Sequence, residues 1–374
     1  MKNPFIFGNA TGGDTFTDRV ADSERLLANF RNGINTILIS PRRWGKTSLV
    51  HKVSGLATAN RLKVVNIDAF SCRTEEDFYK LFAVEIIKQT SNKWEEWVEN
   101  TKRFLSSLVP RFSFGTDPMT DFSFSLEFSD KKISEEVLNL PQKMADEKNI
   151  RIVICIDEFQ QITEFKDGLI FQKRLRSVWQ LQKNVNYCLY GSKKHILSEL
   201  FSRQSMPFYK FGDVMFLNKI STTDWIKFIC ERFRVTDKKI SEELAEKICL
   251  LVENHSHYVQ QFSWLVWFKT DFEVSTEILH WAESDLLNQN STLYYRYIEE
   301  LTAYQINFLH AVAGGVHGEF TRKDVLAKYD LGTASNIKRI KNSLENKELI
   351  DNTNGYITFN DPVFRLWFLK TMRK

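Results

Sequence analysis

The sequence has no apolar run close to the roughly 20 residues that a membrane-spanning helix needs, and no C-x-x-C pair. Its N-terminus lacks a long apolar stretch with a cleavage site, so we expect no secretion signal. Five cysteines are an odd number, which favours reduced, structural thiols over disulfides or a zinc site. A net charge of +4 is too small to indicate nucleic-acid binding by itself. Together these absences predict a cytoplasmic protein that does not act at a membrane.

The bulk composition is that of a soluble globular protein, with 43% hydrophobic and 26% charged residues. A chain of 374 residues is too long for one ordinary core and predicts two or three domains. The 30 phenylalanines and nine tryptophans are spread along the chain. They indicate aromatic-rich cores more than one stacking surface.

The most informative stretch is residues 40–47, SPRRWGKT, between an apolar run at 36–39 and a helix-like segment. A strand, a tight turn and a helix that opens with Gly-Lys-Thr are typical of a phosphate-binding loop, in which backbone N–H groups bind a polyphosphate. Lys46 is expected to reach the β- and γ-phosphates, and Thr47 to ligate Mg²⁺. Ser40 stands where G-x-x-x-x-G-K-[ST] has its first glycine, so its backbone must suit a side chain. A Gly-Lys-Thr at a helix start also arises by chance.

A second motif supports the nucleotide-binding reading. Residues 151–156 form a continuous apolar strand, which is typical of a parallel sheet buried on both faces, and Asp157 and Glu158 follow directly. At this position of a P-loop enzyme, Asp157 would hold the Mg²⁺ shell and Glu158 would take a proton from the attacking water. Either motif alone can be a surface feature, but the two in order, about 110 residues apart, predict ATP binding and hydrolysis.

Further strands are expected at 62–68, 185–190 and 216–220, and helices at 75–93 and 173–183.

The strand at 185–190 is followed by Gly191 and Ser192. Ser192 is our candidate for a residue that senses the γ-phosphate, although Gly-Ser is also a common strand-ending turn. Phe16 and Arg19 precede the first strand, where they either contact the base or pack a helix that runs through Phe30 onto the sheet.

An aromatic hairpin is expected within residues 94–130. Two strictly alternating segments at 111–115 and 121–128 flank a Gly-Thr-Asp-Pro turn signal. Phe122, Phe124, Leu126 and Phe128 then share one face, which is either a packing face or a protein contact site.

The C-terminal half reads as two helical modules. Helices at 225–233, 241–253, 256–270 and 276–287 predict an all-α lid. Helices at 299–313, at 321–329 with Thr321 as N-cap, and at 333–347 are followed by two strands joined at Asn-Gly, which predicts a winged helix-turn-helix. Its third helix carries Lys338, Arg339 and Lys341. These cations would face either DNA phosphates or solvent, and winged helices also dock proteins or act as autoinhibitory modules.

The chain resembles the archaeal-type ATPases of the STAND branch of AAA+-like P-loop NTPases, over nearly its whole length. The resemblance is carried by the motifs quoted above together with NPF at 3–5, FTDR at 16–19, IDEF at 156–159 and DPVFRLW at 361–367. It implies an α/β P-loop NTPase fold with a parallel sheet core (1–220, with the hairpin inserted at 94–130), a helical lid (221–295) and a winged helix (296–374). It also implies that Lys46 and Thr47 bind phosphate and Mg²⁺, that Asp157 binds Mg²⁺ and that Glu158 is the hydrolytic base. With the positional candidates above, the expected nucleotide site comprises Arg19, Pro41, Arg42, Arg43, Trp44, Gly45, Lys46, Thr47, Ser48 and Ser192.

Two departures from this family's pattern concern the nucleotide contacts. The start of the lid helix has NHSH at 254–257 in place of Gly-x-Pro, which leaves His257 as the candidate there. Members often carry an arginine after Pro-x-Tyr, where this chain has Lys210, and Arg203 is a poor substitute for an arginine finger.

We therefore expect an ATP- and Mg²⁺-dependent molecular switch that hydrolyses ATP and couples its nucleotide state to the winged helix. The alternative is a non-hydrolysing, nucleotide-dependent regulator that binds DNA or a protein. A third reading makes the chain a subunit that docks through its aromatic hairpin. The client protein, the oligomeric state and DNA binding stay open. The lack of an N-K-x-D base-reading motif favours ATP over GTP.

Overall fold

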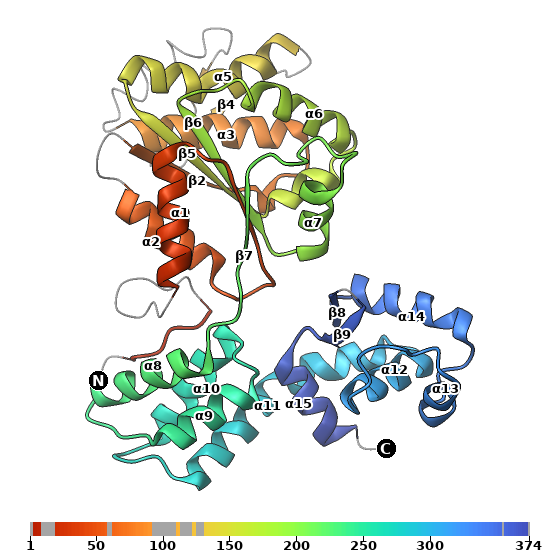
Figure 1. Cartoon of the computed structure of the whole chain (residues 1–374). Helices are drawn as coiled ribbons and strands as arrows, with labels where there is room; N and C mark the ends of the chain where they lie inside the picture. The colour runs from red at the N-terminus through yellow and green to blue at the C-terminus, as the bar shows by residue number, and fades with distance from the viewer. Residues whose placement is uncertain are drawn as a thin grey trace. The chain divides into compact units, whose positions relative to one another are not determined.

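The computed structural model of the chain describes residues 3–8, 19–57, 62–91, 110–112, 122–124, 131–353 and 355–372. The chain divides into two compact units (Figure 1). The sheet unit is Ala10–Asn218, and the helical unit combines Met1–Asn9 with Lys219–Lys374.

The sheet unit is built on a five-stranded, all-parallel sheet with the order β2-β5-β6-β1-β7. Its strands are β1 (Thr36–Ile39), β2 (Leu62–Asp68), β5 (Arg151–Asp157), β6 (Val185–Gly191) and β7 (Asp213–Phe216). This confirms the predicted parallel α/β core. β1 and β2 begin and end where the apolar runs predict. The bounds predicted for the fifth strand, 216–220, are wrong. β7 starts three residues earlier, where the Asp213 N–H donates to the Asn35 carbonyl oxygen next to β1.

Helices cover both faces of this sheet (Figure 1). α1 and α2 pack on one face, where Leu26, Phe30, Leu49 and Val53 meet the β1, β5 and β6 side chains. The other face is covered by α3, α5, α6 and α7, through a core rich in phenylalanine. The bounds are α1 (Val20–Asn32), α2 (Lys46–Ala57), α3 (Glu75–Thr90), α5 (Lys131–Lys148), α6 (Gly168–Trp179) and α7 (Lys194–Ser202), with short 3₁₀ turns η2 (Ala69–Ser71) and η3 (Phe159–Glu164). α6 begins five residues before the helix predicted at 173–183, and α7 lies where the sequence predicts no helix.

Two short strands, β3 (Pro110–Phe112) and β4 (Phe122–Phe124), pair antiparallel, as the alternating pattern predicts. The turn between them and the proposed aromatic face at 122–128 lie outside the described residues and side chains.

The helical unit begins with four helices, as predicted for the lid region. Their bounds are α8 (Thr222–Arg234), α9 (Glu242–Leu251), α10 (Ser256–Lys269) and α11 (Thr276–Glu299). The expected helix end at 287 and the expected helix start at 299 are both wrong. The polar stretch between them stays helical because Tyr294 is buried against Phe364 and Trp367.

The C-terminal part has the predicted order of three helices and a hairpin. The elements are α12 (Ala303–Ala313), α13 (Lys323–Tyr329), α14 (Ala334–Asn346), β8 (Ile350–Thr353), β9 (Tyr356–Phe359) and a final α15 (Pro362–Thr371). Thr321 is not an N-cap. α13 starts two residues later than expected, and Arg322 at its cap position binds the Asp324 carboxylate at 3.0 and 2.8 Å.

Residues 3–8 belong to the helical unit. Phe5 is fully buried against Phe228 and Phe233, and Phe7 packs on Trp264. Within the described residues, no helix has the length and apolar character needed to cross a bilayer.

Candidate functional site

The loop between β1 and α2 has the backbone of a tight turn at its C-terminal end. Gly45 has φ 91°, in the region that favours glycine, and Arg43 has φ 61°. Ser40, in the first-glycine position, is not among the described residues with positive φ, so its side chain causes no backbone strain. Because α2 begins at Lys46, the N–H groups of its first turn are at this loop.

The Lys46 side chain folds back onto the start of the loop. Its side chain is buried, and Nζ donates to the carbonyl oxygens of Ser40 and Pro41 at 2.8 and 2.7 Å. Burial lowers the pKa of Lys46 to about 8, although the Asp157 and Glu158 carboxylates nearby act in the opposite direction. Nζ also donates to the Ser40 hydroxyl at 3.3 Å, and a buried ammonium held by neutral oxygens can exchange them for phosphate oxygens.

Thr47 and Asp157 are joined directly across the sheet edge. Thr47 Oγ1 donates to Asp157 Oδ2 at 2.9 Å, so the two motifs meet at one point. Burial raises the pKa of Asp157 to about 6, against the hydrogen bonds from Thr47 and the Glu158 N–H, which lower it. A partly buried carboxylate beside a hydroxyl offers two oxygen ligands of the kind that Mg²⁺ binds.

Glu158 follows β5 in a left-handed conformation with φ 50°, which turns its side chain away from the strand direction. Its Oε2 accepts hydrogen bonds from Ser192 Oγ at 2.9 Å and from Gln160 Nε2. Arg42 of the loop donates through Nε to the same Ser192 hydroxyl at 3.2 Å. The candidate base, the candidate sensor and the loop are therefore linked by hydrogen bonds.

Arg19 contacts the main chain of the loop. Its guanidinium is buried and donates to the carbonyl oxygens of Trp44 and Asn218, both at 2.9 Å, and to Asp22 at 3.2 Å. A contact of Arg19 with a base stays a prediction, and Phe16 lies outside the described residues.

The other predicted residues occupy the loop and its flanks. Arg42 and Arg43 are exposed, Trp44 is half-buried, and Ser48 is buried inside α2. His257 belongs to the helical unit, where its ring packs edge-on to Phe7 at 6.0 Å. Arg203 is exposed and paired with Glu199 one helical turn before it.

Sequence reasoning missed two residues of this site. Asp68 ends β2 exactly opposite Asp157 in the sheet register, and its charge contributes to the raised pKa of Asp157. Gln160 is buried and reaches Glu158 from η3. Asp68 could have been predicted, because a second strand-like segment ends in this aspartate. No sequence feature indicates Gln160, because its burial depends on tertiary packing.

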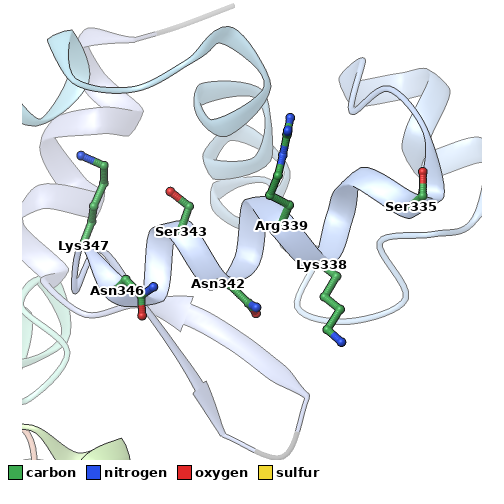
Figure 2. A pocket seen from close by; sticks show the side chains of 7 residues that line it. All are labelled: Ser335, Lys338, Arg339, Asn342, Ser343, Asn346 and Lys347. Atoms are coloured by element: carbon green, nitrogen blue, oxygen red, sulfur yellow. The ribbon is translucent and has the colours of Figure 1, made fainter.

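A second surface lies on α14 of the winged-helix part. A shallow groove of about 630 Å³ is lined by Ser335, Lys338, Arg339, Asn342, Ser343, Asn346 and Lys347 (Figure 2). Lys338 and Arg339 are exposed and form no ion pair with the described residues, while Lys347 is paired with Glu300. Lys341, predicted to share their face, instead lies 4.9 Å from the centroid of the Phe320 ring.

The comparisons with known proteins agree with this architecture. Residues 292–370 match the protein family described as "Probable winged helix domain". Curated protein sequences gave no significant match.

Solved structures resemble nearly the whole chain. The Walker-type ATPase PABY2304 of Pyrococcus abyssi has a TM-score of 0.67 at 17% identity, over 97% of this chain and 99% of that one. The ORC2 protein of Aeropyrum pernix, in ADPNP–ADP complexes, has a TM-score of 0.56 at 14% identity, over 95% and 96%. Its ADP form has a TM-score of 0.51 at 13% identity, over 93% and 90%. The chain thus has the fold of the archaeal Walker-type ATPases with a C-terminal winged helix, as the sequence resemblance predicts.

Proposed function

We propose that this protein binds ATP with Mg²⁺ and hydrolyses it, as a molecular switch of the STAND or AAA+-like class. The observation that carries the proposal is the 2.9 Å hydrogen bond between Thr47 and Asp157. It joins the end of the phosphate-binding loop to the end of β5, where P-loop enzymes hold the metal. Solved structures of similar fold, one of them in ADPNP–ADP complexes, support adenine nucleotides as ligands.

The residues fit a Mg²⁺ ion in the chemistry of their donors. A threonine hydroxyl and a carboxylate are the hard oxygen ligands that Mg²⁺ takes together with substrate phosphates and water. Among the described residues there is no cluster of three or more acidic, histidine or cysteine side chains that could hold a metal. Thr47 and Asp157 would therefore hold Mg²⁺ only jointly with the nucleotide. When bound, the ion neutralises charge on the phosphates.

Other groups of the chain would bind the phosphates, accept the proton and respond to the γ-phosphate. Lys46 would leave the Ser40 and Pro41 carbonyls for the β- and γ-phosphates, and the α2 N–H groups would bind phosphate oxygens. Glu158 would accept a proton from the attacking water, while Ser192 and Arg42 would respond to the γ-phosphate.

The contacts of Arg19 support a route for the switch within the sheet unit. The Arg19 guanidinium binds the carbonyl of Trp44 in the loop and the carbonyl of Asn218, the last residue of this unit before the chain enters the helical unit. A change in the loop on nucleotide binding would reach the connection through Arg19. The client that uses this change is a protein or DNA.

The test is steady-state phosphate release from ATP·Mg²⁺ by the wild type and Glu158→Gln, with binding of a fluorescent ATP analogue measured in parallel. We expect release to fall by about 10²–10⁴-fold in the variant with binding retained. Glu164→Gln, an exposed carboxylate paired with Lys193, is the matched control. Equal release by wild type and Glu158→Gln would contradict hydrolysis at this site and favour a non-hydrolysing regulator.

The groove on α14 favours DNA as a second ligand. Lys338, Arg339, Asn342 and Asn346 line this groove on the third helix, the element that enters the major groove in many winged and helix-turn-helix proteins. Lys338, Asn342 and Asn346 point to one side of α14 and Arg339 to the other (Figure 2). Arginine, lysine and asparagine are the side chains that contact phosphates and base edges there.

Fluorescence anisotropy with duplex DNA tests this second function. Replacing both Lys338 and Arg339 with alanine should weaken binding and reduce its salt dependence by about two phosphate contacts. Lys328→Ala, an exposed cation on α13, is the control. Binding that is insensitive to the double substitution would exclude this face.

A further inference from the structure

We propose that Gln160 is a positioning residue for the candidate base: its amide fixes the Glu158 carboxylate for proton abstraction. The inference rests on the proposed function and deepens it. Glu158 Oε2 accepts from Gln160 Nε2 on one side and from Ser192 Oγ, 2.9 Å away, on the other. The Ser192 N–H also donates to this oxygen, at 3.4 Å. Donors from two sides of one oxygen fix the plane of the carboxylate and leave the other oxygen for a proton.

The Gln160 side chain is held in place by its surroundings. Glu158 before it has φ 50°, and Phe159 beside it is fully buried against Phe201 and Phe208. The main chain of Gln160 is fixed as well, because its carbonyl accepts a hydrogen bond from Thr163 Oγ1 at 2.8 Å. Gln160 is thus the second residue of a 3₁₀ turn whose main chain is hydrogen-bonded and whose first side chain is buried, so its amide reaches Glu158 from a well-anchored position.

Burial of this amide is costly for the fold, which points to a role outside stability. Gln160 is 2% exposed, and its Oε1 is buried with no donor among the described residues. A buried acceptor without a donor is destabilising, whereas an apolar side chain of similar size would pay no such penalty. Residues that break the rules of stable packing without local compensation are expected at functional sites.

The neighbouring strand makes room for the same amide. A Cβ atom built on Gly191 would lie 1.9 Å from Gln160 Oε1, at the point where β6 passes η3. Gly191 is directly followed by Ser192, so one close approach places both donors around Glu158.

The test is Gln160→Met, which keeps the length of the side chain and removes the amide. We expect kcat for ATP to fall about tenfold, with KM and nucleotide affinity within about twofold of wild type, because the phosphate contacts are untouched. Gln161→Met is the matched control: Gln161 bonds Glu164 at 3.0 Å on the exposed side of the same turn and should change neither quantity. The melting temperature of Gln160→Met should equal or exceed that of wild type.

A double-mutant cycle separates positioning from a general structural effect. If Gln160 acts through Glu158, Gln160→Met should have no further effect on the residual rate of Glu158→Gln. Wild-type kcat in Gln160→Met, or a tenfold loss that persists in the Glu158→Gln background, would overturn the inference while leaving hydrolysis intact. Absence of phosphate release by wild type itself would overturn both this inference and the proposed function.

Discussion

Tyr258 donates its hydroxyl proton to Asp361 Oδ2 over 2.6 Å, and this bond joins α10 of the lid region to the start of the final helix α15. Tyr294 of α11 is a second donor to the same oxygen at 3.2 Å, while Asp361 Oδ1 accepts the N–H groups of Val363 and Phe364. Burial raises the pKa of Asp361 above its ordinary value. The aspartate of the DPVFRLW motif therefore ties three helices of the helical unit together.

We expect Tyr258→Phe to lower the free energy of unfolding of the helical unit by about 1.5–3 kcal/mol, because a buried carboxylate loses a hydrogen bond. Denaturant unfolding followed by tryptophan fluorescence measures the loss. Tyr295→Phe is the control, since Tyr295 lies one residue beyond Tyr294 and is half exposed. An unchanged midpoint for Tyr258→Phe would show that the bond contributes nothing.

Asp157 should destabilise the free protein at neutral pH. Its pKa is raised to about 6 from 3.8, so the penalty of its charge is fully present above about pH 6 and disappears below 3.8. We expect Asp157→Asn to be more stable than wild type by about 1–2 kcal/mol at pH 8, less than the whole pKa change implies because the carboxylate is only partly buried. The gain should shrink at pH 4.5. Thermal unfolding at both pH values without nucleotide or metal decides this, and a gain independent of pH would contradict it.

The parallel strands were the most predictable part of the fold. β1 and β5 are short apolar runs buried on both faces, so composition alone marks their bounds, whereas the edge strand β2 is only partly buried and mixes polar with apolar residues. The start of β7 could not be predicted, because its first residue, Asp213, is polar. Asp213 is paired with Arg25 and Asn29, two partners that no local pattern reveals. The predicted end of α11 is too early, because the burial of Tyr294 depends on residues about 70 positions further along the chain.

The residues of the candidate site that belong to a spaced sequence motif could be predicted. Lys46, Thr47, Asp157 and Glu158 come together at one sheet edge because parallel strands end on the same side. Gln160 could not be found in the same way. Its place beside Glu158 follows from a left-handed turn and from the absence of a side chain at Gly191, and both are properties of packing rather than of local sequence.

Gly191→Ala should reproduce the kinetic effect of Gln160→Met. The added methyl group would overlap Gln160 Oε1 and lie 3.2 Å from the Glu158 Cα, so the amide must move away. We expect kcat to fall with nucleotide affinity preserved, and Gln160→Met should cost little more in the Gly191→Ala background. Gly55→Ala in α2, where a Cβ meets no atom within 4 Å, is the control. Full activity of Gly191→Ala would show that the close approach is not needed for catalysis.

Nucleotide binding should take up protons at alkaline pH through Lys46. In the free protein, burial holds the pKa of Lys46 at about 8, so a substantial fraction of the amine is neutral near pH 8.5. Phosphate oxygens in place of the Ser40 and Pro41 carbonyls would favour the ammonium and raise its pKa. We therefore expect an uptake of roughly three-quarters of a proton per nucleotide at pH 8.5 and close to none from Lys46 at pH 6.5, where it is already protonated. Calorimetric titrations in two buffers of different ionisation enthalpy measure this number. In Lys46→Arg, whose guanidinium stays charged throughout, the alkaline uptake should disappear, and an uptake that persists there would assign the proton to another group.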